Sequence, residues 1–428
     1  MKKTKIIEYG LIFFLFLFWN LIISPINLDE IWNYGFTRNI YLGLIPYKDF
    51  NMIVTPLFPM LFSIPMHIVG DNMLFFHIEN AILLTGIIYY IEKIIGNNKY
   101  YILPFFLWPL NITYPSYNLF SFFLVLLILF LEDKKDNDSK IGILLGLLFL
   151  AKQSIGLLFI LIQFIMKKKK RVLLSLIPIL IFGLYLLITN SFSQFIDQCF
   201  LGLLDFNGNG NYFNILFFIT IIFLILNITM IIKDRRNTSF YYLLAYSIIV
   251  FPLFDYYHFL FYFILFIILF LKTNKYQFIK YNLIGKIVFL VVIGLSILSF
   301  KKGSYPNNFT PFQYRYIPKE YQLSTIDVNN LIKKYKKVMI VGPNAYYHKI
   351  ILNQKIKDID LINKGNWGYK GSEKLKKKVN EIKEEYVFFI DKGEIGIEKQ
   401  TDQEIIKYIK ENATRIENTK YYEIYQFE

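Results

Sequence analysis

Long apolar runs separated by short polar segments make up the first 300 residues, and the rest of the chain is mostly polar. A helix needs about 20 apolar residues to cross a bilayer, and fewer where other helices shelter it. Eleven runs qualify as predicted spans, at residues 6–26, 73–91, 100–113, 116–131, 141–151, 154–166, 172–188, 213–232, 239–254, 257–271 and 282–300. The pattern predicts an α-helical polytopic membrane protein.

Two apolar segments need a separate interpretation. Residues 55–70 contain Pro56, Pro59 and Pro65, so we expect an in-plane or re-entrant helix there rather than a span. The first run is too long for the apolar region of a signal peptide, and no small-residue cleavage site follows it. We therefore interpret it as the first span.

The loops between the runs predict an orientation, because cytoplasmic loops carry the excess of Lys and Arg. If the N-terminus is cytoplasmic, every inside loop is basic, as in 167–171. The outside segments 113–116, 189–212 and 255–257 lack Lys and Arg, and the first outside loop, 27–72, has only Arg38 and Lys48. Eleven spans then leave the C-terminus outside.

Residues 301–428 predict a separate, small extracytoplasmic α/β domain. Strand-like runs occupy 338–341 and 386–390, and helical charge patterns occupy 372–385 and 401–411. We therefore divide the chain into a membrane part, 1–300, and a C-terminal domain, 301–428.

Composition excludes several classes of function. The net charge of +15 sits largely in short tracts between apolar runs, where lysine sets orientation, so we expect no nucleic-acid partner. A lone cysteine, Cys199, excludes an internal disulfide or a Cys-based zinc cluster, and no HExxH spacing joins the histidines. The abundance of Ile, Lys, Asn, Phe and Tyr is typical of an AT-rich bacterial genome, which predicts the bacterial cytoplasmic membrane.

Candidate chemistry begins in the first outside loop, where Asp29 and Glu30 follow the first span. Paired carboxylates can take a proton from a hydroxyl or help to hold a divalent cation. The alternative is that Asp29 caps a helix over residues 31–41. Further along the loop, Lys48 is flanked by Tyr47 and Asp49. Its ammonium group can bind a phosphate, or it can extend toward lipid headgroups.

Two other stretches place polar groups near the membrane. The runs 141–151 and 154–166 are each short for a span, so Lys152 and Gln153 between them should lie part-way into the bilayer. A lysine there either pairs with a carboxylate for packing or lines a cavity for an anionic ligand. In the tight turn 251–258, Asp255 and His258 can share a helix face, or can be chance polar residues.

Together these features resemble the GT-C class of membrane glycosyltransferases, which includes protein O-mannosyltransferases and lipid A aminoarabinose transferases. The likeness rests on LDE at 28–30, GLIPYKDF at 43–50, TPL at 55–57 and GLLFLAKQ at 146–153. It covers about residues 1–300, as a transmembrane glycosyltransferase domain, and leaves the C-terminal domain unassigned. The chain departs from many relatives in having Thr55 before Pro56, where they show consecutive prolines.

The resemblance implies transfer of a sugar from a polyprenyl-phosphate donor to an acceptor hydroxyl on the outer face, by direct displacement with inversion. Asp29 would be the general base and Glu30 its neighbour in the catalytic site. Lys48 and Lys152 would hold the donor phosphate, with Tyr47, Asp49, Gln153, Asp255 and His258 as supporting residues. The implied partners are the lipid bilayer, the donor and a glycan, lipid or protein acceptor, in the assembly of a cell-surface polysaccharide or glycoconjugate.

Two other functions remain open from sequence. A polysaccharide polymerase should carry arginines in a large mid-chain outside loop, but 189–212 has none. A lipid-linked glycan transporter should show internal repeats and charges spread through its spans, and neither is clear.

Overall fold

The computed structural model describes most of the chain, with gaps. The described residues are 3–23, 26–107, 112–205, 214–251, 254–273, 282–298, 304–306, 315–335, 337–342, 344–353, 367–393 and 403–428. Contacts divide the chain into two compact units. Unit 1 comprises Met1–Ser24, His77–Phe182 and Gly210–Lys301; unit 2 comprises Pro25–Phe76, Gly183–Asn209 and Lys302–Glu428.

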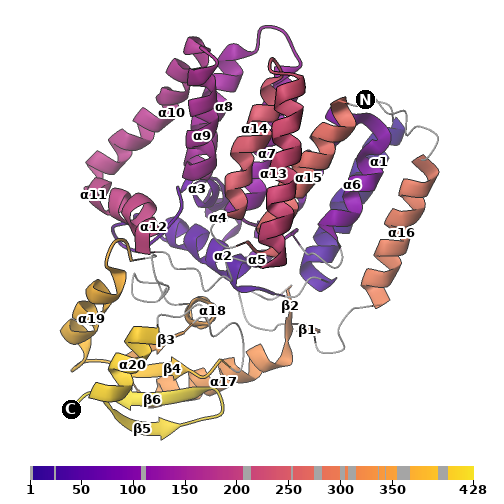
Figure 1. Cartoon of the computed structure of the whole chain (residues 1–428). Coiled ribbons are helices and arrows are strands. Elements are labelled where there is room, and N and C mark those ends of the chain that lie inside the picture. The colour runs from indigo at the N-terminus through magenta and orange to yellow at the C-terminus, as the bar shows by residue number, and fades with distance from the viewer. Residues whose placement is uncertain are drawn as a thin grey trace. The chain divides into compact units, whose positions relative to one another are not determined.

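A helix lies in each of the eleven predicted spans, most of which belong to unit 1 (Figure 1). The helices are α1 Lys3–Phe18, α5 Met73–Ile95, α6 Lys99–Phe106, α7 Tyr117–Glu132, α8 Asp138–Ala151, α9 Gln153–Ile165, α10 Lys169–Ile188, α13 Ile215–Lys233, α14 Thr238–Tyr246, α15 Tyr256–Thr273 and α16 Asn282–Leu298. A π-helical turn, Trp19–Ile23, extends α1, and a 3₁₀ turn, Ser247–Val250, extends α14. Helices α7, α8 and α9 pack on one another consecutively along the chain. Helix α14 packs on α9, α13 and α15.

Five helices among the described residues are long and apolar enough to cross a membrane. They are Lys3–Ile22, Met73–Ile95, Lys169–Ile188, Ile215–Lys233 and Tyr256–Thr273. Large apolar side chains on α10 remain exposed, with Leu180 at 63% and Ile188 at 81%. Water would penalise such a face and lipid would not. The protein is a multi-pass membrane protein.

The predicted pair of short helices around Lys152 is confirmed. Lys152 adopts an extended conformation between α8 and α9, which have 14 and 13 residues. A Cβ added to Gly156 would lie 2.2 Å from the Cα of Phe149, and one added to Gly146 would lie 2.3 Å from the carbonyl oxygen of Ser175 in α10. These glycines let the backbones approach closely, as small residues do between membrane helices.

Unit 2 combines the loop that follows the first predicted span, a mid-chain segment and the C-terminal residues. Its helical elements are α2 Leu28–Tyr41, α3 Leu57–Ser63, α4 Met66–Val69, α11 Phe192–Ile196, the π-helical turn η3 Asp197–Leu201, α12 Gly202–Asp205, α17 Lys319–Lys334, α18 Ala345–Ile351, α19 Gly371–Ile382 and α20 Gln403–Asn412. Residues 55–70, for which the sequence predicts an in-plane or re-entrant helix, contain the two short helices α3 and α4 with Pro65 between them. The chain order alone does not indicate that the first loop groups with residues beyond 301.

The C-terminal residues of unit 2 contain two small sheets (Figure 1). The antiparallel pair is β1 Ser304–Pro306 with β2 Tyr316–Pro318; the larger sheet has β3 Val338–Val341, β4 Val387–Asp391, β5 Thr414–Asn418 and β6 Tyr422–Gln426. In the order β3-β4-β6-β5, β3 and β4 are parallel and the other pairs antiparallel.

Two helices cover one face of the larger sheet. Leu375 and Val379 of α19 and Ile405 and Ile409 of α20 are buried in one hydrophobic cluster with side chains of β3, β4 and β6. The predicted strands at 338–341 and 386–390, and the helices predicted at 372–385 and 401–411, are confirmed with small differences at their ends. Pro343 and residues 401–402 lie outside the described residues.

Candidate functional site

The first carboxylate of the candidate site, Asp29, lies in the first turn of α2 and is half-buried. The cap of this helix is Asn27, whose side-chain oxygen accepts a hydrogen bond from the backbone N–H of Glu30 at 2.8 Å. The helix therefore begins at Leu28, ahead of the expected start, and Asp29 does not cap it. A carboxylate at this helix end is favoured by the helix dipole.

Glu30 is fully buried in an ion pair with Arg315. The guanidinium donates from Nε to Oε1 at 2.9 Å and from Nη2 to Oε2 at 3.1 Å, and both side chains are 1% exposed or less. The guanidinium and the carboxylate therefore form a bidentate ion pair, with two hydrogen bonds between opposite charges. The pair joins the start of α2 to the residue before β2, within unit 2.

A second buried arginine, Arg38, holds the other end of α2. Its Nε pairs with the carboxylate of Asp71, and its Nη2 donates to Oδ1 of Asn353 at 2.7 Å. The hydroxyl of Tyr34, one turn earlier, donates to the same carboxylate at 2.6 Å. Burial, followed by the charge of Asp71, raises the pKa of Tyr34, so this tyrosine remains protonated at neutral pH.

Lys48 is exposed in a tight loop whose flanking residues turn inward. Tyr47 is buried, and its hydroxyl donates to the carbonyl of Val54 at 2.8 Å. Asp49 accepts a hydrogen bond from the backbone N–H of Ile45 at 2.7 Å. The loop therefore fixes the backbone on both sides of Lys48 and presents its ammonium group outward.

Lys152, at the break between α8 and α9, begins a chain of polar contacts in unit 1. Its ammonium donates to the side-chain oxygen of Asn118 and lies 5.4 Å from the ring centre of Tyr117. The amide nitrogen of Asn118 contacts Nε2 of His258 at 3.3 Å, and Nδ1 of His258 contacts Asp255 at 2.8 Å. Asp255 and His258, for which the sequence left two alternatives open, are in contact, and Asn118 links them to Lys152.

The chemistry of these groups assigns the proton positions. An ammonium only donates, so the oxygen of Asn118 faces Lys152 and its amide nitrogen faces His258. Since the amide nitrogen also only donates, Nε2 of His258 accepts and Nδ1 carries the proton toward Asp255. All three hydrogen bonds run in one direction, from a cation to a carboxylate.

Opposing effects act on the pKa of Asp255. Burial raises it, but hydrogen bonds from the ring and backbone of His258 and the charge of Lys152 outweigh burial, so the pKa lies below its ordinary value. Asp255 is therefore ionised at neutral pH.

Aromatic side chains lie next to this polar chain. The ring of Tyr257 stacks on Tyr114 with centroids 4.8 Å apart, and its hydroxyl is 2.7 Å from the hydroxyl of Ser116. Gln153 is buried as the first residue of α9. Charged, amide and aromatic groups thus gather where α7, α9 and α15 begin.

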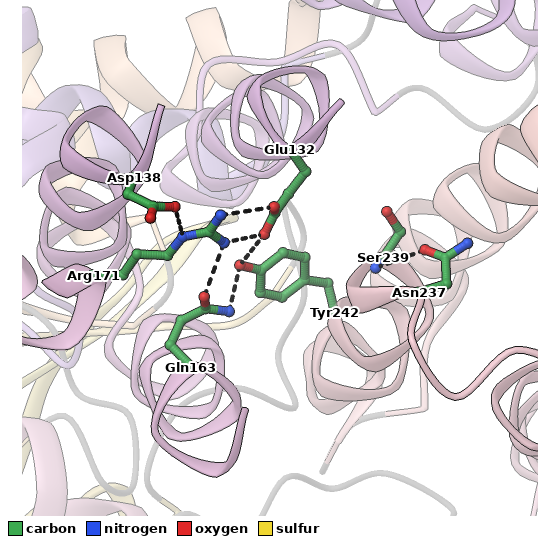
Figure 2. Close-up of polar contacts among 7 residues, drawn as sticks. All are labelled: Glu132, Asp138, Gln163, Arg171, Asn237, Ser239 and Tyr242. Carbon is green, nitrogen blue, oxygen red and sulfur yellow. Dashed lines mark hydrogen bonds and ion pairs between the residues drawn. The ribbon is translucent and has the colours of Figure 1, made fainter. Parts of the chain in front are cut away.

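A second polar cluster in unit 1 is formed around Arg171 (Figure 2). Its guanidinium pairs with Glu132 and Asp138, and also donates to Gln163 at 3.0 Å. Gln163 donates in turn to the hydroxyl of Tyr242 at 2.6 Å. The five side chains come from α7, α8, α9, α10 and α14, so the cluster joins five helices. Figure 2 also shows Asn237, which caps α14 through the backbone N–H of Ser239.

The predicted site residues therefore fall into two groups. Tyr47, Lys48 and Asp49 share one loop of unit 2, and Asp29 and Glu30 lie in helix α2 of the same unit. Lys152, Gln153, Asp255 and His258 lie in unit 1. Sequence reasoning did not identify Arg315 and Asn118 as partners of these residues. Among the residues that the structure describes, no three His, Cys, Asp or Glu side chains gather to hold a metal ion.

Comparisons with known proteins place the fold. The chain matches the crystal structure of ArnT from Cupriavidus metallidurans bound to undecaprenyl phosphate, with a TM-score of 0.59 and 9% identity over 99% of this chain and 98% of that chain. The apo structure of the same ArnT gives a TM-score of 0.58 and 8% identity, over 99% and 97%. This chain has an ArnT-like fold.

The remaining comparisons add little. An oligosaccharyltransferase from Archaeoglobus fulgidus, in complex with zinc and sulfate, shows a TM-score of 0.42 and 13% identity over 90% of this chain and 68% of that chain. No family model matches the sequence, and no curated protein matches it. At the level of the fold, the likeness to ArnT confirms the GT-C resemblance that the motifs in residues 1–300 indicated, and it extends through the C-terminal residues.

Proposed function

We propose that this protein is a membrane glycosyltransferase that moves a sugar from a polyprenyl-phosphate donor to an acceptor hydroxyl. The observation that carries the proposal is the ArnT-like fold over 99% of the chain, since that ArnT was crystallised with undecaprenyl phosphate. The exposed Lys48 supplies a cation of the kind that a lipid phosphate requires.

The proposed reaction is a single displacement. Asp29 accepts the proton of the acceptor hydroxyl as its oxygen attacks the anomeric carbon of the donor sugar. The bond from that carbon to the phosphate oxygen breaks, polyprenyl phosphate leaves, and the anomeric configuration inverts. Both oxygens of Glu30 are bound by Arg315, so the role of base falls to Asp29, and Glu30 keeps the start of α2 in place.

Lys48 acts on the leaving group. Negative charge grows on the phosphate as the glycosidic bond breaks, and a fixed ammonium stabilises that charge without reorganising. The loop that holds Tyr47 and Asp49 inward supports this role, because it presents Lys48 from a defined backbone. We propose the outer face of the bacterial cytoplasmic membrane as the location, with the product entering a cell-surface polysaccharide or glycoconjugate.

Lys152 is proposed as a further cation for the donor phosphate. Its ammonium donates a hydrogen bond to the amide oxygen of Asn118, at the break between α8 and α9. Gln153, Asp255 and His258 support it, the last two by ending the directional chain on a carboxylate. Replacing Lys152 with Met, compared with the exposed Lys135→Met, tests this assignment separately from Lys48.

The proposal is tested by the binding of undecaprenyl phosphate to the purified protein. Lys48→Ala should weaken binding by about 10- to 100-fold, the value expected for losing a hydrogen bond to a charged group. Lys319→Ala, at an exposed lysine of α17, is the matched control and should bind normally. Wild-type protein that does not bind this lipid, or Lys48→Ala that binds equally well, overturns the proposal.

A further inference from the structure

The mid-chain segment from Phe192 to Asp205 is interrupted by the π-helical turn η3, Asp197–Leu201. A π turn holds about one residue more than an α-helical turn, is rare, and is frequently found at functional sites. In η3 the consecutive side chains of Asp197, Gln198 and Cys199 all find partners elsewhere in unit 2.

Gln198 binds the backbone on both sides of Lys48. Its Oε1 accepts from the N–H of Met52 at 2.9 Å, and its Nε2 donates to the carbonyl of Tyr47 at 3.1 Å. An amide side chain offers an acceptor and a donor side by side, as this pair of contacts requires. Gln198 is 9% exposed, so water has little access to replace it.

Neighbouring side chains of the same segment strengthen the hold on this loop. The ring of Phe195 packs on the ring of Tyr47 with centroids 5.2 Å apart, and the thiol of Cys199 lies 3.7 Å from the carbonyl of Met52. Burial raises the pKa of Cys199, which keeps it a neutral thiol. The segment therefore contacts the Lys48 loop through three side chains.

The loop needs such support because its backbone is strained. Tyr47 has a φ of +69°, in the left-handed region that residues other than glycine rarely adopt. Conformations of this kind persist only where surrounding contacts impose them. Since Lys48 follows Tyr47 directly, any relaxation at Tyr47 redirects the lysine.

The first residue of η3, Asp197, contacts the beginning of α19 and the residues just before it. Oδ1 of Asp197 accepts from the backbone N–H of Tyr369 at 3.0 Å, and Oδ2 pairs with Lys374. Gly368 has a φ of +78°, and a Cβ there would lie 2.1 Å from Oδ2 of Asp197. Glycine at this position therefore permits the close approach.

We propose that Gln198 is a positioning residue for Lys48, and that η3 connects the C-terminal residues 367–374 to the Lys48 loop. Gln198 does not touch the donor; it sets the backbone from which the lysine reaches the phosphate. The C-terminal region thereby contributes to donor binding through Asp197. The inference rests on the proposed function, in which Lys48 binds the donor phosphate.

The test is a double-mutant cycle on the binding of undecaprenyl phosphate by the full-length protein. Gln198→Leu should weaken binding by about tenfold or more, because small misplacements of a positioned group are costly. Gln198→Glu, which keeps the acceptor for Met52 but loses the donor to Tyr47, should weaken binding as well. Gln194→Leu, at an exposed glutamine in α11, should have no effect.

The decisive readout is the Lys48→Ala, Gln198→Leu double variant. If Gln198 acts through Lys48, the double variant binds no more weakly than Lys48→Ala alone. Losses that multiply, or normal binding by both Gln198 variants, overturn the inference while leaving the role of Lys48 intact. Normal binding by Lys48→Ala instead overturns the proposed function.

The same cycle extends to the C-terminal residues. Lys374→Met should weaken lipid binding in the wild-type background and have no effect in the Lys48→Ala background. Lys377→Met, at an exposed lysine of the same helix, is the control. Normal binding by Lys374→Met removes the C-terminal residues from the proposal.

Discussion

Basic residues in this chain have two different roles that look alike in the sequence. Arg171 belongs to the basic loop 167–171 that predicts the orientation, yet it is buried in ion pairs with Glu132 and Asp138. Lys99, between two predicted spans, is likewise buried in ion pairs with Glu8 and Glu92. Asp138 and Glu132 lie 33 and 39 positions from Arg171. Glu92 is seven positions from Lys99, but it belongs to α5 and Lys99 to α6, so no pattern within one helix marks these residues. Arg315 was missed for the same reason, because Glu30 is 285 positions away.

The Glu30–Arg315 pair yields a prediction about stability. Removing one partner leaves a buried charge without compensation, which costs about 3–5 kcal/mol. Glu30→Gln should therefore lower the thermal unfolding temperature of the protein in detergent, and adding Arg315→Met should recover part of the loss. Glu320→Gln, at an exposed glutamate of α17, should leave the temperature unchanged. A Glu30→Gln variant as stable as the wild type contradicts the buried ion pair.

Asp255 yields a prediction about pH. Its pKa lies below the ordinary value of about 3.9, so its ionised form stabilises the fold fully above that pH, and the contribution is lost as the pH falls through the folded pKa. Asp255→Asn should therefore lower the unfolding temperature at pH 7, and the difference from wild type should shrink toward pH 3. A difference that does not change with pH would show that the charge of Asp255 is not involved.

At the scale of elements, apolar periodicity predicted the helices well and the strands only in part. Each predicted span contains a helix, and the break at Lys152 follows from two runs that are each too short. The strands β3 and β4 were visible as apolar runs because both are buried. β5, with its largely exposed sequence TRIEN, and β6, with YEIYQ, carry no such run; pairing with β4 and with each other defines them.

The Arg171 cluster yields a prediction about stability, because its side chains join five helices of unit 1. Arg171→Met should destabilise the protein by about 3–5 kcal/mol, because it leaves Glu132 buried without its partner. The expected result is a clear fall in the unfolding temperature, whereas the exposed Lys170→Met should behave like the wild type. If the two variants unfold at the same temperature, the cluster does not support the helix packing.

At the scale of the whole molecule, the sequence resemblance reached residues 1–300, and the ArnT-like fold reaches 99% of the chain. The sequence could not show that the first loop packs with the C-terminal residues, since the contacts Glu30–Arg315 and Arg38–Asn353 join distant positions. It does offer Asp29 and Lys48 as candidates, a carboxylate and a cation in the loop that follows the first predicted span. Their roles in catalysis and donor binding remain predictions.

The most direct test of the central claim is mass analysis of surface glycans from cells that carry wild-type protein, Asp29→Asn or no protein. The account predicts that the wild type adds a sugar mass that is absent without the protein. Asp29→Asn should fail to add it while reaching the membrane and binding undecaprenyl phosphate normally. Asp136→Asn, at an exposed aspartate, should add it like the wild type. An Asp29→Asn variant that restores the full glycan would contradict the account.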